Sequence, residues 1–198
     1  MFANIAESVY GPGQREAGRA QIEEFHAIGV LQPGLRREVQ VDTGEDRLFT
    51  LTLWDDEAAL GAARLVMAPV SARLLNPLRT QPSQRIGFGP VVRDSSTLGA
   101  TYAVLAAVTY APGQQEAGLA GAEEYRALVD RQAGARGAIF IDAGAGRQLV
   151  LRLWASEAEQ QASSAMLRAA FARLVAPWQS APLQWLGAGT VVRDTVPG

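Results

Sequence analysis

Side chains able to perform acid–base or nucleophilic chemistry are few in this chain of 198 residues. It contains one histidine, His26, and neither cysteine nor lysine, so all 18 basic residues are arginines. Without cysteine there is no thiolate nucleophile and no thiolate ligand for zinc or an iron–sulfur cluster. Without lysine there is no Schiff-base chemistry, and a single histidine cannot form a histidine pair for a metal. We therefore expect no metal site and no chemistry that depends on a cysteine or lysine side chain.

The overall composition is that of a globular protein, with 48% hydrophobic residues, 19% charged residues and a net charge of -2. The arginines are scattered, so no basic stripe predicts a nucleic-acid partner. No apolar run approaches the roughly 18 residues of a membrane helix. The first residues also lack the basic and apolar regions of a secretory signal. These features predict a cytoplasmic protein that binds neither nucleic acid nor membrane.

The two halves of the chain are similar and align without a gap when the sequence is shifted by 100 residues. About 37 of roughly 94 aligned residues are identical, far more than chance gives for an ungapped match. Trp54, for example, recurs as Trp154. We predict two units, residues 1–95 and 101–198, joined by a linker at residues 96–100.

Each half is expected to follow the order β-α-β-β-α-β, which is that of a ferredoxin-like fold. Pro69 is expected to bend or split the second helix. Two helices cover only one face of such a sheet, so a lone unit would leave apolar surface open. We therefore predict an α+β protein whose two tandem ferredoxin-like units form an intramolecular pseudo-dimeric α+β barrel. In the first half, the predicted strands are residues 2–10, 35–41, 47–54 and 84–93, and the predicted helices are residues 14–30 and about 56–76.

Strand alternation separates two faces of each predicted sheet. On the third strand we expect Leu51 and Leu53 to face the helices, and Thr50, Thr52 and Trp54 to face the barrel interior. The residues predicted to share the interior face are more polar in the first half than in the second. This asymmetry favours one retained pocket, located in the first half.

A tryptophan ends the third strand of both halves and is followed by a helix cap and Glu-Ala, in segments 54–58 and 154–158. With the element order, this makes nearly the whole chain similar to the dimeric α+β barrel superfamily, and within it to the antibiotic-biosynthesis-monooxygenase-like domains. The superfamily includes cofactor-free quinone-forming monooxygenases and haem-degrading enzymes, so the fold alone assigns no reaction. The haem-degrading relatives use a first-strand asparagine, the third-strand tryptophan and a second-helix histidine. This chain has Asn4 and Trp54 but no such histidine, so the resemblance implies the cofactor-free reaction.

The candidate substrate-binding residues each have a structural alternative. Trp54 and Trp154 would stack on a planar ligand, or would fill the end of the barrel. Asn4 and Ser8 would hydrogen-bond a substrate oxygen, or would meet backbone or water. Thr52 is expected beside them on the interior face.

The arginines and the histidine are also open to two interpretations. Arg36 and Arg152 would neutralise a carboxylate or phenolate, or would form solvated ion pairs. Histidine is a common general base, which makes His26 a candidate. However, its counterpart in the second half is Arg126, so we expect His26 to be exposed and not catalytic.

The leading hypothesis is a small-molecule-binding barrel, active as a cofactor-independent monooxygenase on an aromatic or quinone-type substrate. The catalytic residue stays unassigned, with Trp54, Asn4 and Arg36 as candidates. The alternative is a non-catalytic ligand- or protein-binding module with a filled barrel. A small aromatic molecule is the expected partner, and the helical outer faces could pair again in a homodimer.

Overall fold

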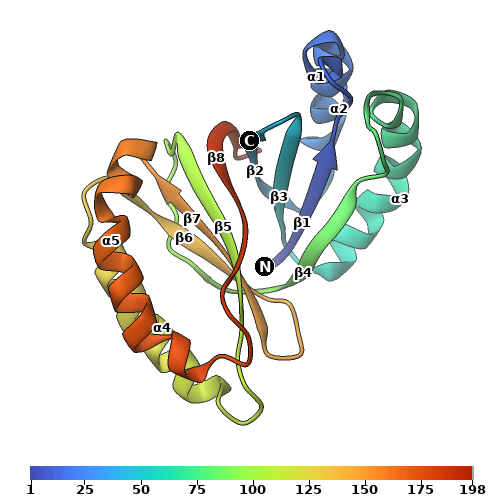
Figure 1. Cartoon of the computed structure of the whole chain (residues 1–198). Helices are drawn as coiled ribbons and strands as arrows, with labels where there is room; N and C mark the ends of the chain where they lie inside the picture. Colours follow the sequence, from blue (N-terminus) through green and yellow to red (C-terminus); the bar gives the residue numbers. More distant parts are fainter. Residues whose placement is uncertain (198) are drawn as a thin grey trace. The chain divides into compact units, whose positions relative to one another are not determined.

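A computed structural model describes residues 1–197, and within them the helices and strands follow the predicted order in both halves (Figure 1). The α+β class and the tandem ferredoxin-like arrangement are therefore confirmed. The first half contains β1 (Phe2–Val9), α1 (Gln14–Ala17), α2 (Arg19–Gly29), β2 (Leu35–Gly44), β3 (Arg47–Trp54), α3 (Glu57–Leu74), a 3-10 turn (Asn76–Leu78) and β4 (Gln84–Asp94). The second contains β5 (Tyr102–Thr109), α4 (Gln115–Asp130), β6 (Ala135–Asp142), β7 (Arg147–Trp154), α5 (Glu157–Leu174), a 3-10 turn (Ala176–Trp178) and β8 (Gln184–Thr195).

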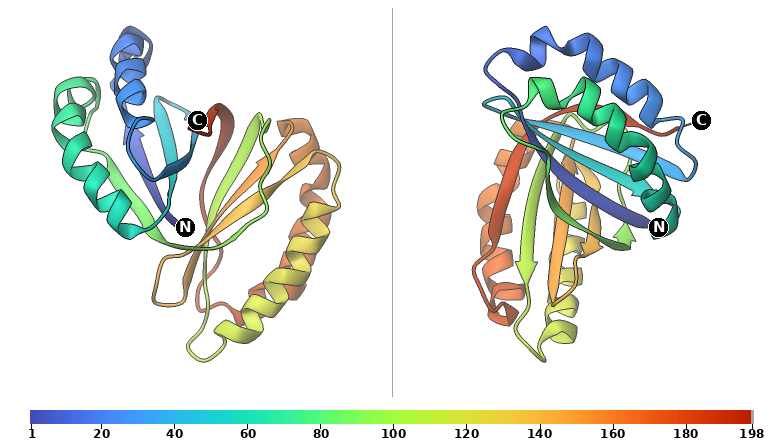
Figure 2. Two further views of the ribbon diagram at one scale, coloured as in Figure 1. Left: turned by 180° about the vertical axis from the view of Figure 1, so that it is seen from behind. Right: turned by 90° about the vertical axis from the view of Figure 1, so that its right-hand side faces the viewer.

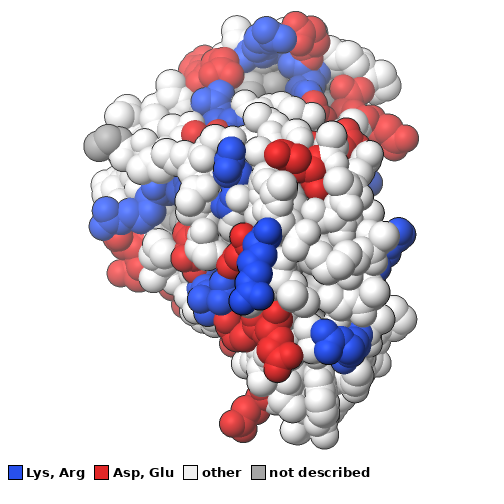
Figure 3. Space-filling model, turned by 90° about the vertical axis from the view of Figure 1, so that its left-hand side faces the viewer, with Lys and Arg blue, Asp and Glu red and all other residues white. Residues whose placement is uncertain are grey.

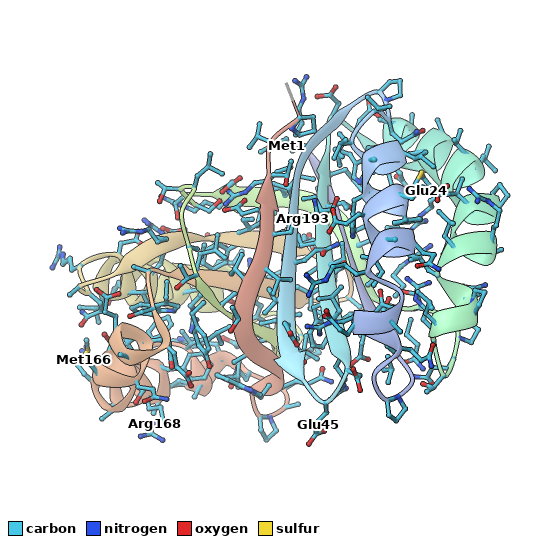
Figure 4. The ribbon with its side chains drawn as sticks, turned by 90° about the horizontal axis from the view of Figure 1, so that it is seen from above. Met1, Glu24, Glu45, Met166, Arg168 and Arg193 are labelled. Atoms are coloured by element: carbon cyan, nitrogen blue, oxygen red, sulfur yellow. The ribbon has the colours of Figure 1, made fainter. Side chains whose placement is uncertain are left out.

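The compact units differ from the predicted domains at the strand that ends each half. Unit 1 comprises residues 1–90 and 192–197, and unit 2 comprises residues 91–191. The end of β4 pairs with β6 in unit 2, and the end of β8 lies beside β2 in unit 1, where Figure 4 labels Arg193. These pairings satisfy sheet edges that would otherwise stay open. Residue 198, the predicted end of the second domain, lies outside the described residues.

Hydrogen-bonded strand neighbours follow the order β1-β3-β2-β8-β5-β7-β6-β4, and β4 also pairs with β1. In unit 1 the sheet therefore runs β4-β1-β3-β2-β8, with α2 and α3 on one of its faces (Figure 2). The strand order is the one that the predicted barrel requires. The antiparallel register places Asn4 opposite Thr52 and Ala6 opposite Thr50, which aligns the residues of the candidate site.

Local sequence signals explain where the long helices begin. Asp56 caps α3 by accepting a hydrogen bond from the backbone N–H of Ala59 at 2.8 Å, and Ser156 caps α5 in the same way. Such caps satisfy backbone donors that have no partner within the helix. Pro69 does not split α3. This helix extends over 18 residues, the same length as α5, which has no proline.

The strand parity was predicted correctly, but the assignment of faces was wrong. Thr52 and Trp54 lie on the helix-covered face, where they share a cavity with Leu60 of α3. Leu51 and Leu53 point to the opposite face and are 2% and 1% exposed. Both faces of this sheet are buried, so alternation separates the two sets of side chains without showing which set meets the helices.

No helix in residues 1–197 is long and apolar enough to cross a membrane. On the face shown in Figure 3, arginines and acidic residues lie beside one another. That face therefore lacks the continuous basic stripe that follows a nucleic-acid backbone.

Candidate functional site

A cavity of about 220 Å³ lies inside unit 1, between its sheet and the helices α2 and α3. The strands contribute side chains of one parity, because alternate residues of a strand share a face. The cavity thus brings together four predicted site residues that are far apart in the sequence. Its lining includes Asn4, Ala6, Ser8, Glu38, Gln40, Thr50, Thr52 and Trp54 from the sheet, and His26, Leu60, Ala63, Arg64 and Met67 from the helices.

Trp54 forms an aromatic wall at one end of this cavity. Its indole Nε1 donates a hydrogen bond to Thr52 Oγ1 at 2.9 Å, which fixes the orientation of the ring. The ring packs with Leu35, Leu60 and Ala63, and the residue is only 5% exposed. A fixed aromatic plane beside a cavity can stack on a planar ligand.

A polar pair lies at the same end. Arg64 Nη2 donates a hydrogen bond to Asn4 Oδ1 at 2.8 Å. Burial lowers the pKa of the Arg64 guanidinium below its ordinary value, and the charge of Arg85 lowers it further. No carboxylate within residues 1–197 forms an ion pair with Arg64, so its charge is available to an anionic oxygen in the cavity.

The middle of the cavity contains a buried cluster of His26, Glu38 and Gln40, each no more than 6% exposed. His26 Nδ1 lies 2.9 Å from Glu38 Oε1, and Gln40 Nε2 lies 2.6 Å from the same oxygen and 2.7 Å from His26 Nε2. One assignment satisfies all three contacts. The Gln40 amide donates to both partners, and His26 donates from Nδ1 to Glu38 and accepts at Nε2.

The expectation that His26 is exposed was therefore wrong. The reasoning relied on Arg126, its counterpart in the second half. However, the Arg126 side chain is only 17% exposed, because it turns back to pair with Glu123 and Asp130 on its own helix. A charged residue in one half is consequently no evidence of exposure in the other.

The far end of the cavity is formed by Arg79 and hydroxyl groups. Arg79 Nη1 donates to Ser71 Oγ at 3.1 Å and lies 3.4 Å from Asn76 Oδ1. Its Cζ lies 5.9 Å from the centroid of the Tyr10 ring. The Nε atom is buried and has no hydrogen-bond partner, and burial lowers the pKa of the guanidinium.

Arg36 lies outside this cavity. Its side chain is 60% exposed and forms an ion pair with Asp55. The register of β2 shifts between Leu35 and Arg37. Strict alternation would place Arg36 on the same face as Glu38, but a bulge of this kind interrupts it. Sequence parity alone does not reveal such a bulge.

Arg152 and Trp154 line a second cavity of about 360 Å³, which lies within unit 2. Arg152 Nη1 lies 3.1 Å from the Tyr125 hydroxyl, and its Cζ lies 4.7 Å from the centroid of the Tyr125 ring. Val104 takes the place of Asn4 in this cavity. The expectation of a single retained pocket was therefore wrong, because the predicted binding residues are divided between a polar cavity in unit 1 and a more apolar one in unit 2.

Sequence reasoning missed several polar residues of the unit 1 cavity. Glu38, Gln40 and Arg79 were not among the candidate site residues. The signal that could have found them is the difference between the halves, because the positions of Glu38 and Gln40 hold Ala138 and Phe140 in the second half. In residues 1–197, no three His, Cys, Asp or Glu side chains are grouped as metal ligands would be.

Comparisons with known proteins agree with this architecture. The sequence matches no protein-family model and no curated protein sequence. Solved structures do match over the whole chain. A protein of Fusobacterium nucleatum subsp. nucleatum named "putative monooxygenase" has a TM-score of 0.75 at 8% identity, and the match covers 100% of this chain and 94% of that one.

Two further structures show the same likeness. A protein of Lactobacillus acidophilus NCFM with the same name has a TM-score of 0.71 at 8% identity, covering 100% of this chain and 96% of that one. An anthrone oxidase-like protein has a TM-score of 0.68 at 14% identity, covering 100% and 93%. These matches confirm the tandem α+β fold that the sequence predicted.

Proposed function

We propose that unit 1 binds a small phenol of one or two rings and oxidises it with molecular oxygen to a quinone, without a bound cofactor. The observation that carries this proposal is the cavity beside Trp54 that also contains the buried His26–Glu38 pair. The names of the structural neighbours agree with an oxygenase of this class. A cavity of about 150 Å³ holds benzene, so about 220 Å³ has room for one or two substituted rings.

The proposed chemistry begins with removal of the phenolic proton. His26 Nε2 takes this proton once the phenolic hydroxyl displaces the Gln40 amide that donates to it. Glu38 then stabilises the resulting imidazolium through Nδ1–H. Arg64 and Asn4 hold negative charge on the substrate, and Trp54 keeps the ring in one plane. The phenolate passes electrons to oxygen at its unsubstituted para carbon. One oxygen atom becomes the quinone carbonyl and the other leaves as water, so a phenol and O₂ give a quinone and H₂O.

Oxygen uptake by the full chain tests this function. We would measure oxygen consumption and quinone absorbance with 1-naphthol and simple phenols in metal-free buffer. Trp54→Phe keeps an apolar wall and should lower turnover several-fold, whereas His26→Gln should abolish it. Trp154→Phe makes the equivalent change in unit 2 and should leave turnover unchanged.

A binding titration with 1-naphthol, made beside the oxygen-uptake assay, separates catalysis from binding. If 1-naphthol binds but is not turned over above the His26→Gln level, the protein is a non-catalytic binder, which is the alternative considered from the sequence. If Trp154→Phe reduces turnover as much as Trp54→Phe, the reaction does not belong to the unit 1 cavity.

A further inference from the structure

Arg79 is a partly buried cation whose charge no side chain in residues 1–197 balances with an ion pair. Its hydrogen bonds reach no carboxylate, because Nη1 donates to Ser71 and Asn76 and the guanidinium also bonds with the Tyr10 side chain. Another buried arginine, Arg37, is paired with Asp194, with Nε and Nη2 donating at 2.7 and 2.9 Å to its two carboxylate oxygens. On Arg79 the same two-donor edge has no such partner, although a buried donor without one is costly.

The second half of the chain shows that the fold does not need this charge. Arg79 bridges to Tyr10 through the backbone, and Gln179 forms the same bridge to Tyr110. The backbone arrangement is therefore kept when the side chain is neutral. The surrounding hydroxyls change with it, since Ser8, Ser71 and Ser83 correspond to Val108, Phe171 and Leu183.

This concerted replacement sets one end of the unit 1 cavity apart. Ser8, Ser71, Ser83 and Tyr10 add hydroxyl groups to the cavity lining that also contains Arg79. A partly buried guanidinium in a lining rich in hydroxyls matches the planar, two-oxygen shape of a carboxylate.

We propose that the end of the cavity around Arg79 is a carboxylate-binding subsite, so that the ligand of unit 1 is a hydroxyaryl carboxylate. This inference rests on the proposed function for the phenolic part of the ligand. The strand register gives the separation between the histidine cluster and the Arg79 end of the cavity. Gln40 of the cluster is level with Thr50 and Ala6 across the sheet, and Ser8 lies two residues beyond Ala6 along β1. Two strand residues span about 7 Å, which is comparable to the length of a benzene ring with its substituents.

Binding of a matched pair of ligands to the full chain tests the subsite. 3-Hydroxybenzoate and the neutral 3-hydroxybenzamide have nearly the same shape, and isothermal titration calorimetry measures both affinities. We expect the carboxylate to bind about tenfold or more tightly than the amide, as one or two charge-assisted hydrogen bonds imply. Arg79→Gln installs the residue found at this position in the second half and should remove the preference without weakening the amide. Arg73→Gln removes an exposed arginine of α3 and should leave both affinities unchanged.

Several results would overturn the subsite. These are equal affinities in the unchanged protein, a preference that survives Arg79→Gln, or no binding of either compound at millimolar concentration. Turnover of 1-naphthol without a carboxylate preference would refute the subsite and leave the proposed function standing. A preference that depends on Arg79, in a protein that oxidises no phenol, would support the subsite and refute the oxidation.

Discussion

Replacing Glu38 by alanine should destabilise unit 1 strongly, because Glu38 is the shared acceptor of His26 and Gln40. The change leaves two buried donors without a partner, at about 1–3 kcal/mol each. The adjoining cavity can admit a water molecule, so we expect the lower half of that range, about 2–4 kcal/mol in total. This is a large share of the roughly 5–15 kcal/mol that stabilises a domain.

Urea unfolding followed by tryptophan fluorescence measures this loss. With a slope of about 2 kcal/mol/M, the midpoint of Glu38→Ala should fall by about 1–2 M. Glu38→Gln keeps an acceptor oxygen at the same place and should lose less than half as much. Glu24→Ala removes a half-exposed carboxylate that pairs with Arg73, and should change stability by no more than about 0.5 kcal/mol. Equal midpoints for Glu38→Ala and the unchanged protein would refute the proposed hydrogen-bond network.

Two further predictions concern stability. Gly121→Ala should destabilise unit 2, because the added Cβ would lie 1.9 Å from the Leu174 carbonyl oxygen. Gly61→Ala meets no atom within 4 Å inside α3 and should stabilise by about 1 kcal/mol, and thermal unfolding of both variants would show opposite shifts. The hydrogen bond from Arg15 lowers the pKa of Asp42, so its stabilisation is present above about pH 4 and is lost as pH falls through the lower folded value. The difference in unfolding free energy between Asp42→Asn and the unchanged protein should accordingly be seen at pH 7 and shrink below about pH 4. A constant difference over this range would contradict the assignment.

Catalytic and subsite predictions depend on different parts of one cavity. The proposed oxidation depends on Trp54 and His26, whereas the proposed carboxylate selection depends on Arg79, and all three residues line this cavity. Trp154 and Gln179 occupy the matching positions of unit 2, so the chain provides its own reference residues for both tests.

The sequence alone determined the duplication, the order of strands and helices, and the difference in polarity between the two halves. These features follow from periodicity, turn residues and helix caps, which act between neighbours in the chain. They also follow from direct comparison of the aligned halves, in which Asn4 and Ser8 correspond to Val104 and Val108. Asn4, Ser8, Thr52 and Trp54 were accordingly predicted to share one face of the sheet, and they do.

Only the tertiary structure decided that the helices pack on that face of the sheet. Both faces are buried, and strand alternation does not distinguish one buried face from the other. A bulge, invisible in the pattern of residue types, separates Arg36 from Glu38. The burial of His26 depends on contacts with Glu38 and Gln40, more than ten residues away along the chain. These contacts form only when α2 packs on β2. The hydrogen-bond partners of His26 are therefore set by the tertiary structure.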